Sequence, residues 1–194
     1  MSKDTKGVSR RDLLTFWRKP LADLKDAALD RPKPPPPPLR PLPLRPPGMM
    51  HELMLVSACQ HCGKCVEVCP AEAIYPLGPE WGKAAGTPAI DARKQPCVLC
   101  DGLKCTHVCP SGALIPVYVN RDVTMGTAAL DDNRCLAFNG RACDACKGAC
   151  PMPGAIVIED NGHVRVDSAL CVGCGLCERA CPTEPTSIRV RPRD

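Results

Sequence analysis

The chain has few of the side chains that usually build a hydrophobic core. Only six of its 194 residues are aromatic, two each of Phe, Trp and Tyr. Large apolar side chains supply much of the buried area that stabilises a small domain, so we expect another source of stability here. The sequence also has no run that approaches the about 20 apolar residues of a membrane-spanning helix. It therefore predicts a domain without a transmembrane span.

The sequence also lacks a recognisable catalytic constellation. We find no nucleophile–base set, phosphate-binding loop or pair of catalytic carboxylates in it. Gly63 and Lys64 lie between cysteines, outside the glycine-rich context of a phosphate-binding loop. The basic surface that nucleic-acid binding requires is restricted to the N-terminal residues. We therefore predict a protein that is not itself an enzyme and does not bind nucleic acid.

The N-terminal quarter of the chain differs from the rest in charge and in proline content. Residues 1–48 carry 11 Lys/Arg and 5 Asp, a net charge of +6, whereas residues 49–194 carry 14 Lys/Arg and 16 Asp/Glu, a net charge of −2. Ten of the 16 residues in PKPPPPPLRPLPLRPP are prolines, which favour an extended polyproline II conformation. We expect an amphipathic basic segment at 1–31, a polyproline linker at 32–48 and a cysteine-rich domain at 49–194.

The segment before the prolines has two interpretations. Ser9-Arg10-Arg11 begins a motif that resembles a twin-arginine export signal, but charged residues interrupt the apolar run that should follow it. Apolar residues instead recur at helical spacing, namely Leu13, Leu14, Trp17, Leu21 and Leu24. We favour an amphipathic arm that docks on a partner or at a membrane surface, in a cytoplasmic protein. Periplasmic location through export stays the alternative.

Cysteine is the residue present in excess. The 16 cysteines form four groups, and each group ends in a Cys-Pro pair. The groups are Cys59, Cys62, Cys65 and Cys69; Cys97, Cys100, Cys105 and Cys109; Cys135, Cys143, Cys146 and Cys150; Cys171, Cys174, Cys177 and Cys181. A disulfide framework has no reason to repeat a proline after every fourth cysteine. The pattern therefore favours metal ligation over disulfides.

The spacing within the groups indicates iron–sulfur clusters. The first and fourth groups follow C-x₂-C-x₂-C-x₃-C-P, as in two-cluster ferredoxins, where the fourth cysteine ligates the neighbouring cluster. The second group (x₂, x₄, x₃) and the third (x₇, x₂, x₃) are looser. Zinc sites also use C-x₂-C pairs, but usually as two separated pairs without a third cysteine at the next x₂ position. We therefore predict four [4Fe–4S] clusters, held by all sixteen cysteines, in preference to zinc.

The cysteine region is an internal repeat, with 27, 25 and 20 residues between successive groups. After Cys-Pro the chain usually becomes apolar, and one such run continues as AIVIEDNGHVRVD. Two alternating segments around Asn161-Gly162 are a strong signal for a hairpin with a two-residue turn. Each unit should contain a cysteine loop, a short helix and a strand. We therefore expect a small α+β fold of two ferredoxin-like dicluster modules, stapled by its cofactors.

Two histidines, His61 and His107, lie inside the cysteine loops. Because the cysteine count is already complete, we interpret them as loop residues near the sulfurs and not as ligands. A histidine in this position can tune a cluster through N–H···S bonding or charge.

Two long stretches carry a family resemblance. GTPAIDARKQPCVLCDGLKCTHVCPSGAL and DDNRCLAFNGRACDACKGACP resemble the ferredoxin-type polyferredoxins of periplasmic nitrate reductase and methylamine utilisation systems, the NapG/MauM type. The resemblance covers roughly residues 50–190. It implies electron transfer between a quinol-side donor and a terminal oxidoreductase. The start of the chain, SRRDLLTFW, is more similar to cytoplasmic ferredoxin-type accessory proteins of nitrate reductase, whose role is nearer to maturation.

We therefore expect an electron-transfer subunit that relays single electrons to or from an oxidoreductase partner in a respiratory-type chain. The alternative is an assembly or maturation factor for a redox enzyme. Larger four-cluster subunits nest one ferredoxin inside another, which implies that the first group pairs with the fourth and the second with the third. In that arrangement each cluster is held by the first three cysteines of one group and the fourth cysteine of its partner group. Cys181 then completes the ligands of the first group and Cys69 those of the fourth. Cys150 completes the ligands of the second group and Cys109 those of the third. Sequential pairing, which exchanges only these final ligands, stays open.

Overall fold

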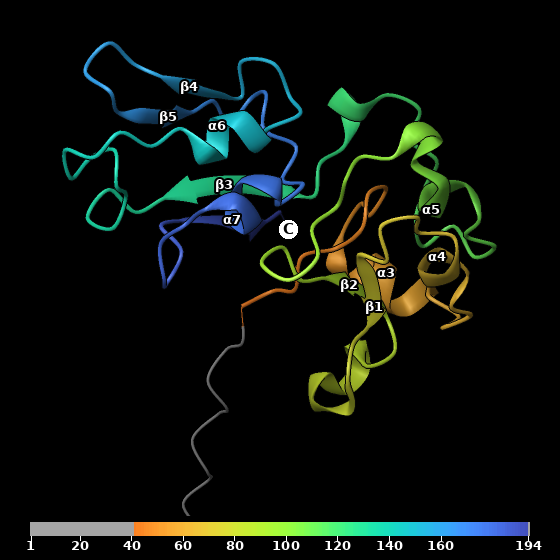
Figure 1. Cartoon of the computed structure of the whole chain (residues 1–194). Coiled ribbons are helices and arrows are strands. Elements are labelled where there is room, and N and C mark those ends of the chain that lie inside the picture. Colours follow the sequence, from red (N-terminus) through yellow and green to blue (C-terminus); the bar gives the residue numbers. More distant parts are fainter. Residues whose placement is uncertain (1–40, 194) are drawn as a thin grey trace, which may run out of the picture. The chain divides into compact units, whose positions relative to one another are not determined.

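The computed structural model describes residues 41–193, which belong to one compact unit beginning at Pro41 (Figure 1). Its elements are short because prolines and glycines interrupt the chain at close intervals. The helices are α3 (Glu52–Ala58), α4 (Lys64–Glu67), α5 (Lys104–His107), α6 (Ala145–Ala149) and α7 (Leu176–Ala180), with 3₁₀ turns η1 (Pro79–Ala84), η2 (Asp101–Leu103) and η3 (Asn120–Asp122). The strands are β1 (Ile74–Pro76), β2 (Pro88–Ile90), β3 (Gly126–Leu130), β4 (Ile156–Ile158), β5 (Val164–Val166) and β6 (Ile188–Pro192).

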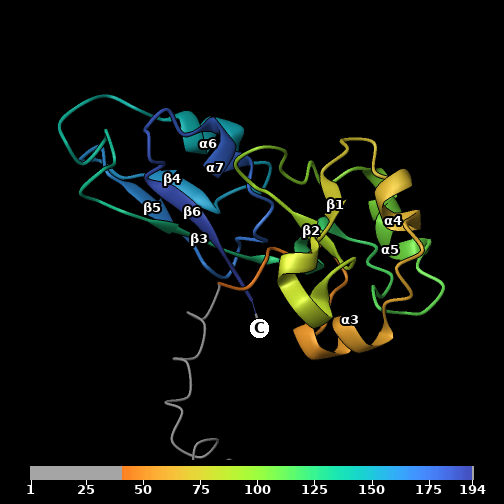
Figure 2. The same cartoon turned by 90° about the horizontal axis from the view of Figure 1, so that it is seen from below.

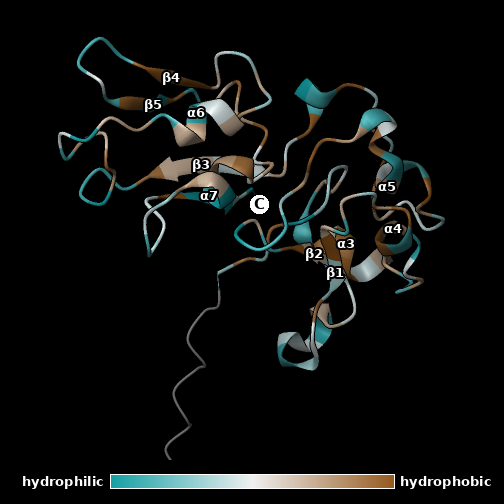
Figure 3. Cartoon of the chain, viewed as in Figure 1, coloured by the Kyte–Doolittle hydropathy of each residue, from teal (hydrophilic) through white to brown (hydrophobic). Residues whose placement is uncertain are grey.

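The strands form antiparallel pairs, β1 with β2, β3 with β6 and β4 with β5. The β4–β5 pair is the predicted hairpin, but its loop has three residues, 160–162, and is not the two-residue Asn161-Gly162 turn. The Glu159 N–H donates to the His163 carbonyl at 2.9 Å, and Gly162 alone in this loop takes a positive φ (83°). Figure 3 shows hydrophobic residues on both strands and hydrophilic residues in the loop that joins them. The β3–β6 pair has a different role. It aligns Gly126 with Pro192 and so ties the C-terminal strand to the middle of the chain.

The elements gather in two halves that follow the order of the sequence. Figures 1 and 2 both show α3, α4, α5, β1 and β2 in one half and the remaining α-helices and strands in the other. Each half packs two cysteine-bearing helices together, α4 with α5 and α6 with α7. A backbone hydrogen bond joins the halves: the Cys97 N–H donates to the Cys174 carbonyl at 3.0 Å.

The core is made of aliphatic side chains, methionine and cysteines. Ile74, Met125 and Val172 are buried in the cluster that also contains Cys105 and Cys174. Among the described residues, no aromatic side chain is buried in this core. The expectation of an aromatic-poor core that needs another source of stability is therefore consistent with the packing.

The compact unit starts earlier than the sequence predicts. The Leu44 carbonyl accepts a hydrogen bond from the Ile90 N–H at 2.8 Å, and Pro46 and Pro47 are fully buried. Residues 41–48, the end of the predicted linker, therefore pack as part of the domain. The predicted basic segment and the Arg10-Arg11 motif lie outside the described residues, so docking and export both stay predictions. Within residues 41–193, no helix has the length and apolar character of a membrane span.

Arg45 fastens this segment to the domain. Its side chain is completely buried and forms an ion pair with Glu52, whose side chain is 15% exposed. The guanidinium also donates to the Thr87 hydroxyl at 2.9 Å and to the Pro88 carbonyl at 2.7 Å. Residues 41–48 thus cover β2 through a buried charge with several partners, not through proline packing alone.

We expect Arg45→Met to lower the free energy of unfolding by about 3 kcal/mol, because it leaves the Glu52 carboxylate and the Pro88 carbonyl without their buried partner. Denaturant unfolding of the anaerobic protein measures this change. The matched control is Arg165→Met, which removes an ion pair with Glu159 whose side chains are 57% and 43% exposed. Its expected cost is below about 1 kcal/mol. Equal losses in the two variants would contradict the role of Arg45.

Candidate metal centres

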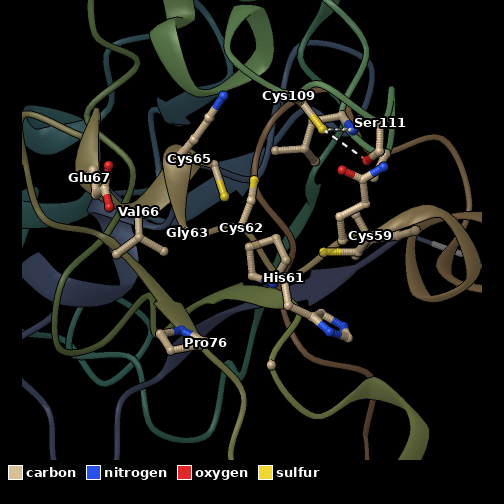
Figure 4. Close-up of a pocket in the computed structure, with 17 residues that line it drawn as sticks. Cys59, His61, Cys62, Gly63, Cys65, Val66, Glu67, Pro76, Cys109 and Ser111 are labelled. Atoms are coloured by element: carbon tan, nitrogen blue, oxygen red, sulfur yellow. Dashed lines mark hydrogen bonds between the residues drawn. The ribbon is translucent and has the colours of Figure 1, made fainter.

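Four cysteines surround a cavity of about 260 Å³ in the first half of the domain: Cys59, Cys62, Cys65 and Cys109 (Figure 4). The first follows helix α3, the next two lie before and within α4, and Cys109 follows α5. Cys62 is exposed and the other three are half-buried. Burial and the neighbouring Cys59 raise the pKa of Cys65 to about 11. Four thiols therefore share one site, and within it a negative charge on Cys65 is costly.

The second set combines three cysteines of the second group with the last cysteine of the first. Burial, and then the neighbouring thiols of Cys97, Cys100 and Cys69, raise the pKa of Cys105 to about 12. The pKa of Cys97 is also raised to about 12, by burial and by neighbours that include Cys100 and Cys69. These mutual effects place Cys69, Cys97, Cys100 and Cys105 together.

The second half of the domain repeats this arrangement in two small cavities. One is lined by Cys135, Cys143, Cys146 and Cys181. The other is lined by Cys150, Cys171, Cys174 and Cys177. Burial raises the pKa of Cys146 to about 11, with the thiols of Cys135 and Cys143 adding to the effect. Each set again takes its fourth cysteine from the neighbouring group in the sequence.

This grouping corrects the nested pairing expected from the sequence. Cys109, and not Cys181, lies with the first three cysteines. Cys181 is the fourth cysteine of the third set, a position that nested pairing predicts for Cys109. The reason is the chain path. Each half of the fold packs two successive cysteine helices side by side, so the fourth cysteine of one group reaches the loop of the group next to it. The first group pairs with the second and the third with the fourth.

Comparison with known proteins identifies iron–sulfur domains in both halves of the domain. A 4Fe-4S dicluster domain model matches residues 58–113, which contain the first two groups, and a 4Fe-4S binding domain model matches residues 164–185. The ferredoxin-type protein NapG of Escherichia coli (strain K12) is 40% identical over 162 residues, covering 77% of this chain and 70% of that protein. The chain belongs to the NapG/MauM family of ferredoxin-type proteins.

Two further relatives extend the comparison of this ferredoxin-type protein. The methylamine utilization ferredoxin-type protein MauM of Paracoccus denitrificans (strain Pd 1222) is 40% identical over 163 residues, 78% of this chain and 72% of the relative. A formate dehydrogenase iron-sulfur subunit of Haemophilus influenzae is 51% identical over 37 residues, 19% of this chain. The resemblance predicted from the cysteine segments is therefore confirmed.

The donor set of this ferredoxin-type protein fits [4Fe–4S] clusters. All sixteen cysteines are free, and soft thiolates are the ligands that such clusters take. Among the described residues no three His, Cys, Asp or Glu side chains converge on a point that would hold a single metal ion. A [4Fe–4S] cluster does not require such convergence, because each of its four iron atoms is bound by a different cysteine. The positively charged core would also offset the cost of the buried thiolates, such as those of Cys65, Cys105 and Cys146.

In three of these sites, a backbone N–H donates a hydrogen bond to a cysteine sulfur. The Ala73 N–H donates to the Cys69 sulfur at 3.3 Å, and the Leu114 N–H donates to the Cys109 sulfur at 3.4 Å. The Ala128 N–H reaches the Cys171 sulfur at 3.4 Å. Such donors stabilise a ligated thiolate and help to set the potential of the cluster that it holds.

The histidines of the cysteine loops have other contacts. His107 lies 3.2 Å from the Val117 carbonyl through Nε2, and its ring meets Tyr118 edge-on at 5.0 Å. His61 lines the first cavity, and its own backbone has a positive φ (53°).

A third histidine, His163, lies in the β4–β5 hairpin and stacks on Phe138, with 4.1 Å between the ring centres. This contact holds the long loop of the third group against the hairpin. No local sequence pattern indicates this contact.

Sequence reasoning also missed the hydroxyl groups around Cys181. Burial alone would raise the pKa of this thiol, but hydrogen bonds from Ser187 and Thr183 outweigh it and lower the pKa to about 6. The sequence signal that could have revealed these hydroxyl groups is the residue two positions after the fourth cysteine of each group. It is Thr183 here and Ser111 after Cys109, but Ala or Met in the other two groups.

Proposed function

We propose that this ferredoxin-type protein binds four [4Fe–4S] clusters through its sixteen cysteines and relays single electrons to or from a partner oxidoreductase in a respiratory-type chain. The observation that carries the proposal is the assembly of four sets of four cysteines, each closed by a cysteine from the neighbouring group. When bound, each cluster accepts and returns one electron. The chain positions these groups and shields them from solvent.

The order of the sets supports a relay. Cys65 of the first set lies near Cys105 of the second, close enough to raise its pKa. Cys174 of the fourth set similarly raises the pKa of Cys97 in the second set, where the two backbones are also hydrogen-bonded. Cys146 of the third set does the same to Cys177 of the fourth. The four sets therefore adjoin one another in the order first, second, fourth, third.

The first set provides the point where a partner approaches most closely. Cys62 is exposed, whereas the other fifteen cysteines are buried or half-buried. Residues 49–194 have a net charge of −2 before any cluster is counted, and each ligated cluster adds about −2. An acidic redox domain suits a partner with a basic rim, and its docking should weaken as salt rises.

The test is anaerobic purification of the full chain followed by iron and acid-labile sulfide analysis. We expect about 16 of each per chain, together with EPR signals of interacting reduced clusters. Zinc without labile sulfide would overturn the proposal. A second measurement separates electron transfer from assembly. Reduced protein mixed with its co-purified oxidoreductase should be reoxidised with its iron retained, whereas passage of clusters into an apo-enzyme would indicate a maturation role.

A further inference from the structure

The sulfur of Cys181 is surrounded by hydroxyl groups. It lies 3.2 Å from the Thr183 hydroxyl oxygen and 3.2 Å from the Ser187 hydroxyl oxygen. Cys181 and Ser187 are buried, with 7% and 3% of their surface exposed. Both hydroxyl-bearing residues belong to the loop between α7 and β6, so this loop encloses the last cysteine of the third set.

The surrounding hydrogen bonds determine which hydroxyl protons can reach the sulfur. The Ser187 N–H donates to the Thr183 hydroxyl oxygen at 2.8 Å, which leaves the Thr183 proton free to point at Cys181. Thr186 is also nearby, but its hydroxyl donates to the Ile188 carbonyl at 2.9 Å. Its single proton is therefore committed elsewhere. The Ser187 carbonyl in turn accepts from the Asp131 N–H at 2.7 Å, which holds the loop in place.

The fourth cysteines of the other groups have fewer donors of this kind. Among the described contacts, Cys69 receives only the backbone N–H of Ala73. The Cys150 sulfur faces the carbonyl oxygen of Met152 at 3.6 Å, which is an acceptor. Cys109 is intermediate, with the Ser111 hydroxyl at a longer 3.6 Å. Two short hydroxyl contacts therefore distinguish the third set.

We propose that Thr183 and Ser187 are tuning residues that raise the reduction potential of the cluster held by Cys135, Cys143, Cys146 and Cys181. Reduction adds one negative charge to the cluster and its thiolates. A hydroxyl that donates to a ligand sulfur stabilises this added charge, so it favours the reduced state. The inference rests on the proposed function, because it requires a cluster in this set. It also gives the order of the sets a bias, since the two hydroxyls favour an electron on the third set, at the end of that order.

The test is an EPR-monitored redox titration of the full anaerobic protein, comparing wild type with Thr183→Val/Ser187→Ala. At an applied potential equal to the wild-type midpoint of this cluster, we expect a roughly tenfold lower ratio of reduced to oxidised cluster in the variant. That ratio corresponds to a midpoint about 59 mV more negative for a one-electron couple. The other midpoints should stay where they are. Ser111→Ala should give a smaller negative shift in a different cluster.

Thr183→Ser is the matched control, because it keeps the hydroxyl that accepts from the Ser187 N–H and donates to Cys181. It should retain the wild-type midpoint. A shift as large as that of the double variant would show that the loop acts through its shape, and the proposal would fail. It would also fail if the double variant kept its iron and its four midpoints. Absence of labile sulfide from the wild type would instead reject the proposed function itself.

Discussion

Cys109→Ser is expected to remove the same cluster as Cys59→Ser. The two thiols line one cavity, although 49 residues separate them in the sequence. Serine is a poor iron ligand because it lacks the soft thiolate, so about a quarter of the iron should be lost. The cluster also joins the end of α3 to the segment after α5. We therefore expect the free energy of unfolding to fall by roughly 4 kcal/mol or more.

The experiment compares the EPR signals and iron content of three single variants. Cys109→Ser and Cys59→Ser should lose one common signal, and Cys143→Ser should lose a different one. If Cys109→Ser instead matched Cys143→Ser, the nested pairing would be right and the grouping in the structure wrong. Full iron content together with an unchanged melting temperature would contradict the view that the clusters staple the fold.

Gly173→Ala is expected to disrupt the fourth set without changing any cysteine. Gly173 has a φ of +74°, and a Cβ atom built on it would lie 2.4 Å from the backbone nitrogen of Gly126. Neither side can move easily, because the Met125 N–H is bonded to the Val172 carbonyl directly beside the contact. Backbone strain and overpacking together should cost roughly 4 kcal/mol or more. The neighbouring ligand Cys174 would be displaced, so iron should also be lost.

Gly140→Ala is the matched control for this effect. Gly140 also lies in a cysteine loop and has a similar φ of +72°, but nothing lies within 4 Å of its added Cβ. Its cost should be limited to backbone strain, about 1–2 kcal/mol. Thermal melting and iron analysis of the anaerobic proteins measure both variants. Similar losses in the two would show that the close approach to β3 is unimportant.

Local features of the fold could be predicted because they depend on short stretches of sequence. The hairpin follows from strand alternation around Asn161-Gly162, and the structure confirms it, although the loop has three residues, 160–162, where the residue pair predicts two. The short helices follow from the frequent prolines and glycines. The family resemblance also depended on contiguous cysteine segments, and the comparison with known proteins confirms it.

Contacts between distant segments could not be predicted in the same way. Leu44 and Arg45 look like part of a proline linker, but they are buried because β2 and Glu52 provide partners for them. The stack of Phe138 on His163 joins two loops whose local sequences carry no mark of each other. Such contacts depend on how the chain returns on itself, which residue patterns do not encode locally.

Cysteine spacing by itself was enough to predict four repeats of iron–sulfur ligand loops. The reason is that the reach of a short loop around a metal site depends on the number of residues between its ligands. The partner of each fourth cysteine was decided by the tertiary structure alone. Cys109 and Cys181 have the same local sequence context, a cysteine followed by proline, and both pairings satisfy it. Only the side-by-side packing of α4 with α5 and of α6 with α7 selects one of them, because it determines which loop lies within reach.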